Sequence, residues 1–464
     1  MGRESETNAF LQGNFGPVRR EADFGDLRVT GALPRELNGT YYRNGPNPAF
    51  EPKGRYHWFD GDGMIHAVTL RDGKASYRNR YVVSEGLREE QRAGRALYPG
   101  LLDLGKEMTE APRFKNTGNT NIVFHAGKLL ALMEGALPTQ LRACSLETLG
   151  EYDFGGRLRT AMTAHPKIDP QTGEMLFFGY APIPPYLTYH LAARDGTLTR
   201  SEEIDIAWPS MIHDFVATRD HVIFLLCPLV FSLENIATRG NPFRWEPERG
   251  TRIGVMPRNG GNADVKWFST DASYVFHPMN AYAEGNRLVI EVARLGRLVF
   301  MDPEAQRQPQ GPEVNPRLHR WTLDLAKGTV ESEPLDDRIA DFPRVNEGRV
   351  GLKHRYGYMA GAGAHMHSTP LFTEIYKYDQ QTGRQETHDF GAGNGCGEAV
   401  FAPRSPTAGE DEGYLMTFVY DAAKDRSDLV ILDAQNVAGD PIARIEIPHR
   451  VPYGFHGNWV AADQ

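Results

Sequence analysis

The sequence predicts an all-β protein whose architecture is a β-propeller. Short apolar and β-branched segments recur along nearly the whole chain of 464 residues, and Asp-Gly, Asn-Gly or single Gly turns bound them. Helical periodicity is scarce, whereas 48 glycines and 31 prolines provide many turns. A sandwich of this size would normally show a linker, and the sequence has none. A closed ring of small sheets therefore explains the length, the strand density and the lack of linkers together.

The expected strands are spaced along the chain and follow turn residues such as Ala126-Gly127 and Thr172-Gly173. They span residues 128–133, 174–180, 221–226, 286–292, 355–360, 374–378, 412–420 and 429–432. No repeat of the Trp-Asp or kelch type stands out, so this pattern does not give the number of blades.

One interruption of the strand pattern, residues 85–104, is expected to be helical and to form part of a cap over one face of the ring. We therefore expect residues 1–464 to form a single propeller domain with cap insertions, including one at about 85–115.

The composition is that of a soluble globular protein, with 40% hydrophobic and 24% charged residues. A net charge of −9 gives no basic surface for a polyanion, so nucleic acid is not an expected partner. Cys144, Cys227 and Cys396 are too few and too scattered for a disulfide framework, which favours a reducing compartment.

The N-terminus is polar and acidic and lacks the pattern of a signal peptide, so a cytoplasmic location is expected. No apolar run reaches the roughly 20 residues that span a bilayer. The longest apolar patches, residues 96–104 and 222–233, are interrupted by proline. They predict at most peripheral membrane contact, or alternatively the walls of a tunnel.

Four of the 15 histidines stand in apolar or small-residue surroundings without an adjacent cationic cluster: His165, His213, His277 and His456. Their separations of 48, 64 and 179 residues exclude a zinc finger or a His-x-x-x-His pair on one helix. They are compatible with four blades that each direct one imidazole toward the ring axis. Imidazoles bind Zn, Cu, Fe and Ni, so the residues indicate a metal but not its identity. Four unrelated core histidines are the alternative.

A metal-bound histidine usually donates its second ring N–H to a carboxylate or a carbonyl. Glu134 ends the apolar run 129–133, and Glu398 lies in the apolar segment 395–401, where an unpaired carboxylate would be costly. Both are candidates for this contact. Alternatively, either one pairs with an arginine such as Arg404 and serves the structure alone.

Along almost its whole length the sequence resembles the carotenoid cleavage oxygenase family. Motifs in the family's order carry the resemblance: His66 and residues 39–48, 56–64, 119–122, 164–166, 211–215, 245–250, 276–280, 425–429 and 454–457. The resemblance implies a seven-bladed propeller with a cap, and Fe(2+) on its axis held by the four histidines.

The same resemblance implies roles for further residues. Glu134 and Glu398 match two of three acids that bind the histidines, and Asp341 stands where the third is usually Glu. We expect its shorter side chain to need a water bridge. Phe59 and Tyr98 are expected near the substrate. Residues with an expected structural role, in turns and pairs within the ring, are Arg43, Asn44, Asp60 and Asp62.

The resemblance implies a non-haem iron(II) dioxygenase that adds O2 to a conjugated C=C bond and yields two carbonyl products. Relatives that cleave phenolic alkenes combine a Tyr with a Lys. Tyr98 matches the first, but Met133 stands at the position of the second and favours an apolar wall. Two substrate classes remain, an apocarotenoid and a phenolic alkene of the stilbene, isoeugenol or vinylphenol type. The rival functions are a retinoid-type isomerohydrolase and a non-catalytic propeller that serves as an interaction platform.

Overall fold

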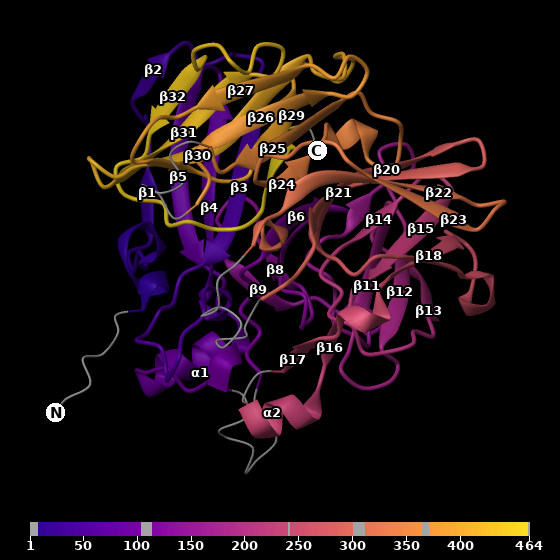
Figure 1. The fold of residues 1–464 in the computed structure, drawn as a ribbon. Coiled ribbons are helices and arrows are strands. Elements are labelled where there is room, and N and C mark those ends of the chain that lie inside the picture. Colours follow the sequence, from indigo (N-terminus) through magenta and orange to yellow (C-terminus); the bar gives the residue numbers. More distant parts are fainter. Residues whose placement is uncertain (1–7, 104–113, 240–241, 300–310, 364–370, 463–464) are drawn as a thin grey trace.

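The strands form a ring of sheets, as expected from the sequence, and the sheets number seven, as the family resemblance implies (Figure 1). The computed structural model describes residues 8–103, 114–239, 242–299, 311–363 and 371–462. Each of the seven sheets has four or more strands, and a separate two-stranded sheet lies outside this set. The fold is therefore an all-β, seven-bladed propeller.

The two ends of the chain close the ring. The first blade has the order β1-β5-β4-β3-β33, so a C-terminal strand pairs with β3 near the N-terminus. Its strands are β1 (Ala22–Phe24), β3 (Gly39–Pro46), β4 (Gly63–Arg71), β5 (Lys74–Tyr81) and β33 (Gly457–Ala461). In return, β2 (Val29–Gly31) pairs with β32 (Ala443–Glu446) in the last blade. This exchange ties residues 29–46 to residues 443–461.

Each of the next five blades is a sheet of four antiparallel strands. The second blade contains β6 (Asn121–His125), β7 (Lys128–Leu132), β8 (Thr139–Leu141) and β9 (Thr148–Glu151). The third contains β10 (Lys167–Ile168), β11 (Met175–Tyr180), β12 (Leu187–Ala192) and β13 (Leu198–Glu203). The fourth is β14 (Phe215–Ala217), β15 (His221–Leu226), β18 (Thr251–Pro257) and β19 (Lys266–Thr270), and the two-stranded sheet β16 (Leu229–Phe231) and β17 (Phe243–Trp245) branches from it.

The remaining blades continue this arrangement. The fifth is β20 (Tyr274–Glu284), β21 (Arg287–Leu295), β22 (Arg317–Asp324) and β23 (Thr329–Pro334), and the sixth is β24 (Ala340–Arg344), β25 (Tyr356–Gly361), β26 (Glu374–Asp379) and β27 (Gln385–Asp389). The seventh adds β28 (Asn394–Cys396), β29 (Val400–Pro403), β30 (Gly413–Asp421) and β31 (Arg426–Asp433) to β32 and β2. All the strands expected from the sequence are present, as β7, β11, β15, β21, β25, β26, β30 and β31.

Apolar side chains pack between neighbouring blades and fix them to one another. Ile223 and Ile253 of the fourth blade share a cluster with Ile290 and Trp321 of the fifth, and all four side chains are buried. Such packing holds the strand ends at the ring axis in fixed positions.

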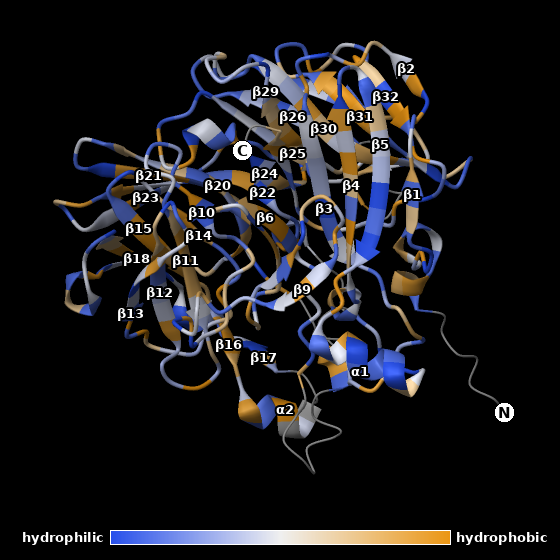
Figure 2. Ribbon diagram, turned by 180° about the vertical axis from the view of Figure 1, so that it is seen from behind, coloured by the Kyte–Doolittle hydropathy of each residue, from blue (hydrophilic) through white to orange (hydrophobic). Residues whose placement is uncertain are grey.

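Two short helices lie on one side of the ring in both views (Figures 1 and 2). The helix α1 (Glu85–Ala93) begins after Ser84, whose side chain accepts a hydrogen bond from the Leu87 N–H, and ends at Gly94 with φ of 67°. The expected helix over residues 85–104 is therefore too long, because the left-handed glycine stops it. Residues 104–113 of the expected cap lie outside the described residues.

The second helix, α2 (Leu233–Arg239), was not expected. Seven residues are too few to show helical periodicity, and the helix follows the apolar patch that ends at Leu233. Isolated turns of 3-10 helix complete the structure: η1 (Ala9–Leu11), η2 (Gly13–Phe15), η3 (Trp58–Asp60), η5 (Pro247–Arg249), η6 (Asn262–Asp264), η7 (Pro312–Val314) and η8 (Glu347–Arg349).

Candidate metal centre and substrate cavity

Four blades each bring one histidine to the ring axis. His165, His213 and His456 stand one or two residues before β10, β14 and β33, and His277 lies within β20 where the pairing with β21 is irregular. Each of these four strands is at one end of the strand order of its sheet. The histidines predicted from the sequence therefore occupy equivalent places in four blades.

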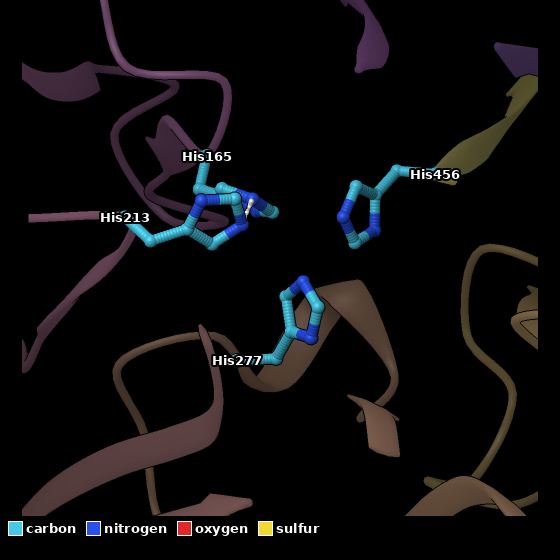
Figure 3. A group of neighbouring side chains, drawn as sticks. All are labelled: His165, His213, His277 and His456. Atoms are coloured by element: carbon cyan, nitrogen blue, oxygen red, sulfur yellow. Dashed lines mark hydrogen bonds between the residues drawn. The ribbon is translucent and has the colours of Figure 1, made fainter. Parts of the chain in front are cut away.

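The four imidazoles converge on one point (Figure 3). One nitrogen from each ring lies within 4.8 Å of the corresponding nitrogens of the other three. The Nε2 atoms of His165 and His213 are 3.0 Å apart, and the rings of His277 and His456 have centroids 4.9 Å apart. All four side chains are buried, with at most 9% of each residue exposed.

Burial keeps most of these imidazoles neutral. It lowers the pKa values of His165, His277 and His456, and the neighbouring histidines lower them further. Burial also disfavours the charged form of His213, but its contact with Glu134 outweighs this effect and raises its pKa. Neutral imidazole is the form that binds a metal ion.

Three of the histidines contact a carboxylate through Nδ1. The distances are 2.7 Å from His213 to Glu134, 2.8 Å from His277 to Asp341 and 2.9 Å from His456 to Glu398. The sequence-based expectation of a water bridge at Asp341 is wrong. A β-bulge follows Asp341, and Phe342 has φ of 51°, so the backbone brings the shorter side chain close enough for a direct hydrogen bond.

The carboxylates are themselves held by further groups. Glu398 lies 3.0 Å from Arg344 and accepts a hydrogen bond from the Gly457 N–H. Burial opposes its ionisation, but Arg344 and His456 lower the pKa of Glu398 to about 2. The arginine suggested from the sequence is therefore wrong, since Arg404 packs over the Tyr414 ring instead. Sequence reasoning missed Arg344 because it lies 54 residues before its partner.

Sequence reasoning also missed the carboxylate beside His165. Asp214 follows His213 in the chain, and its Oδ2 lies 3.5 Å from His165 Nδ1 while Lys167 Nζ lies 2.8 Å from Oδ1. Burial raises the pKa of Asp214, and Lys167 opposes this rise. The signal in the sequence was an acid directly after a candidate ligand, within the motif of residues 211–215.

The donor set fits a metal ion. Four buried imidazole nitrogens face a common point, and three of the rings have their other nitrogen fixed by a carboxylate, which sets the tautomer and the orientation. An all-imidazole set suits Fe, Zn, Cu or Ni. The residues that could hold the ion are therefore His165, His213, His277 and His456.

A cavity of about 780 Å³ opens beside this centre. His213, His277 and His456 line it, together with many aromatic and aliphatic side chains, including Phe276, Phe342 and Phe455. Its size is that of pockets for small organic ligands. The two apolar patches noted in the sequence contribute wall residues, among them Ala96, Leu101, Phe231 and Leu233.

The predicted substrate contacts are all on this wall. Phe59 belongs to η3 and packs edge-on against Phe455 at 5.3 Å, and Met133 lies beside Glu134. Tyr98 also lines the cavity, where its hydroxyl donates to Glu89 Oε2 at 2.8 Å. The structure thus brings Phe59 and Tyr98 to the cavity that contains the histidines.

Of the residues with an expected structural role, Arg43 and Asn44 make contacts within the ring, whereas Asp60 and Asp62 contact residues of the cap side. Asn44 donates to the Gly118 and Asn121 carbonyls, and Arg43 donates to the Pro452 carbonyl. Asp60 accepts from the backbone N–H groups of Leu101 and His57. Asp62 pairs with Lys115. No helix among the described residues is long and apolar enough to cross a membrane.

Comparison with known proteins identifies the family. Residues 15–461 match the family model described as retinal pigment epithelial membrane protein. The chain belongs to the carotenoid cleavage oxygenase family. It is 37% identical to the carotenoid cleavage oxygenase of Mycobacterium tuberculosis over 97% of each chain, and 35% identical to the isoeugenol monooxygenase of Pseudomonas nitroreducens over 99% of each.

Solved structures of this family have the same fold. The crystal structure of the lignostilbene dioxygenase of Pseudomonas brassicacearum superposes with a TM-score of 0.92 at 33% identity, covering 98% of this chain and 99% of the other. The chain is accordingly an enzyme, an oxidoreductase of the dioxygenase type. Its four-histidine centre and the adjoining cavity are the places where a carotenoid cleavage oxygenase can hold a metal and a substrate.

Proposed function

We propose that this enzyme is a non-haem iron dioxygenase that uses O2 to cleave a conjugated C=C bond into two carbonyl products. The substrate is an apocarotenoid or a phenolic alkene of the stilbene, isoeugenol or vinylphenol type. The observation that carries the proposal is the four-histidine centre on the wall of an apolar cavity. The names of the relatives, a carotenoid cleavage oxygenase, an isoeugenol monooxygenase and a lignostilbene dioxygenase, support both substrate classes.

The metal in this proposal is Fe(2+), held by His165, His213, His277 and His456. When bound, ferrous iron supplies the redox chemistry that allows O2 to react with an alkene. Asp341 and Glu398 keep two of the rings oriented by accepting the Nδ1 protons of His277 and His456, and Glu134 lies 2.7 Å from His213 Nδ1. Four neutral imidazoles do not compensate the positive charge of the ion, and the three carboxylates that contact the imidazoles would offset it in part.

The cavity wall positions the alkene. The aromatic side chains Phe59, Phe276 and Phe455 line the space beside the histidines and exclude water from it. In this proposal Phe59 contacts the substrate, and Tyr98 lies against its polar end. Apolar burial binds the substrate, and fixed walls limit the orientations in which its double bond can approach the centre.

We further propose that residues 1–464 act as one propeller domain with a cap that includes about 85–115, in the cytoplasm and with at most peripheral membrane contact. The three cysteines are free, with Cys144 exposed and the other two buried, which supports a reducing compartment.

The test is anaerobic reconstitution with Fe(2+), followed by exposure to isotopically labelled O2 in the presence of apocarotenoids and hydroxyphenyl alkenes. We expect labelled aldehydes from one class and none after reconstitution with zinc. Unlabelled products would instead indicate the isomerohydrolase chemistry. A purified chain that binds no metal and converts no alkene would indicate an interaction platform.

A further inference from the structure

A buried cluster of three charges stands apart from the histidines on the wall of the same cavity. Lys115 Nζ lies 2.5 Å from Asp62 Oδ1 and 2.5 Å from Glu90 Oε2. The side chains of Asp62, Glu90 and Lys115 are only 5%, 4% and 10% exposed, and all three line the cavity. We call these three residues the charged triad.

The charged triad joins the cap to the ring. Glu90 belongs to α1, and its other oxygen accepts a hydrogen bond from the Leu97 N–H at 2.9 Å. Asp62 stands directly before β4, and its other oxygen accepts from the Ala49 N–H at 3.1 Å. These backbone contacts fix both carboxylates, so the ammonium is held between two immobile acceptors.

The charges of the triad do not balance, since two carboxylates surround one ammonium. Two further cations of the described wall, Lys53 and Arg55, are exposed to solvent, which screens their charges, and Arg55 is paired with Asp103. Tyr56, which is 5% exposed, adds a lining hydroxyl that has no hydrogen-bond partner among the described residues. Among the described residues, this part of an otherwise apolar cavity therefore has unused polar capacity and a formal excess of one negative charge.

The chemistry of the triad selects among the end groups of a substrate. Lys115 Nζ donates to Glu90 and forms an ion pair with Asp62, and an ammonium has three N–H donors, so within the described residues at least one donor is left for a ligand. A carboxylate accepts further hydrogen bonds on its free lone pairs. A hydroxyl group can accept from the ammonium and donate to a carboxylate at once. A carboxylate on the ligand can only accept, and the negative excess in a dry site repels it.

We propose that the charged triad is a substrate subsite that binds a neutral hydroxyl group at the end of the alkene and excludes a carboxylate there. The inference rests on the proposed function and narrows its substrate class. In both candidate classes it selects the hydroxylated members: hydroxyphenyl alkenes rather than phenylpropenoic or carboxystilbene acids, and hydroxylated apocarotenoids rather than apocarotenoic acids. Lys115 and Glu90 are thus specificity-determining residues.

The test measures binding to the iron-loaded enzyme without O2, so that no turnover occurs. The ligands are para-hydroxystilbene, unsubstituted stilbene and para-carboxystilbene, together with a hydroxyl-terminated and a carboxyl-terminated apocarotenoid of equal chain length. We expect the hydroxylated member of each set to bind about tenfold more tightly than its unsubstituted or carboxylated counterpart, which corresponds to one charge-assisted hydrogen bond.

The decisive variant is Glu90→Gln, which keeps the side-chain size and an oxygen for the Leu97 N–H but removes the excess charge. We expect it to reduce the preference for hydroxyl over carboxylate about tenfold. Asp62→Asn is the second variant if the first is unstable. Glu85→Gln is the matched control, because Glu85 is an exposed acid of the same helix outside the cavity wall.

Equal binding of the matched ligands by the unchanged enzyme would overturn the subsite. An unchanged preference for hydroxyl over carboxylate in a folded Glu90→Gln or Asp62→Asn variant would also overturn it. An ion pair with a purely structural role would not distinguish between the end groups of the ligand. If the enzyme binds the hydroxylated ligands more tightly but cleaves none of them after O2 is admitted, the proposed reaction is wrong while the proposed subsite is supported. The two failures are therefore distinguishable.

Discussion

The Tyr180 hydroxyl donates a hydrogen bond of 2.9 Å to Glu134. This bond connects a residue of the cavity wall to the carboxylate that contacts His213. The other oxygen of Glu134 lies 2.7 Å from His213 Nδ1. Glu398 and Asp341, in contrast, obtain their additional contacts from a guanidinium and from backbone N–H groups. Glu134 is thus the only one of the three whose described support is a side chain that also lines the cavity.

Replacement of Tyr180 by Phe should weaken metal binding by about tenfold, because Glu134 loses the donor that fixes its orientation behind His213. The affinity is measured by competition with a chelator, using Co(2+) as a stable substitute for iron. Tyr414→Phe is the control, since Tyr414 makes a similar bond to Glu36 far from the histidines. Equal affinities in both variants would show that Glu134 needs no such support.

Asp341 reaches His277 directly because the backbone bends at Phe342, so a side chain longer by one methylene would have to shift the backbone or the imidazole to make the same contact. We expect Asp341→Glu to lower the metal affinity several-fold and to destabilise the fold by about 1–3 kcal/mol through overpacking. Thermal unfolding with and without metal separates the two effects. An Asp341→Glu enzyme that binds metal more tightly would contradict this account of the bulge.

The positions of the four histidines could be predicted because each lies in a short apolar motif before a strand or near its start. The family resemblance implied that all four bind one metal ion. Glu134 and Glu398 were recognisable for a similar local reason, since each is an acid in an apolar segment. The strands of the ring also followed from local patterns of turns and β-branched residues.

The supporting contacts were not predictable from the sequence alone. Arg344 meets Glu398 because the sixth and seventh blades pack side by side, and Lys115 meets Asp62 because the cap folds over the ring. These pairs join different blades, or the cap and a blade, and nothing in the local sequence marks the partner of either residue. Similarly, the direct contact of Asp341 depends on a backbone dihedral angle that side-chain length does not reveal.

His190 should make the stability depend on pH. It is 1% exposed, contacts Thr160 and Ser201 at 2.8 Å each, and burial lowers its pKa to about 4. The unfolded chain, with a histidine pKa near 6.5, takes up the proton first as the pH falls. The contribution of neutral His190 to the free energy of unfolding is therefore fully present above about pH 6.5 and is lost progressively as the pH falls to about 4.

Replacement of His190 by Gln should reduce the loss of stability between about pH 7.5 and about pH 4 by roughly 3 kcal/mol. Urea unfolding at the two pH values provides the measurement. His221→Gln is the matched control, because His221 is only partly buried. If the variant and the unchanged protein lose stability equally, then His190 is not the group responsible.

Phe59 should contribute to substrate binding more than to the chemical step. Its ring lines the cavity and packs against Phe455, the residue before His456. Phe59→Ala removes apolar contact area from the bound alkene, so KM should rise about tenfold while kcat changes less than about threefold. Phe154→Ala is the control, because Phe154 is buried between the second and third blades, and its loss should lower the free energy of unfolding without changing KM. A loss of kcat with unchanged KM would instead assign Phe59 to the positioning of the centre through Phe455.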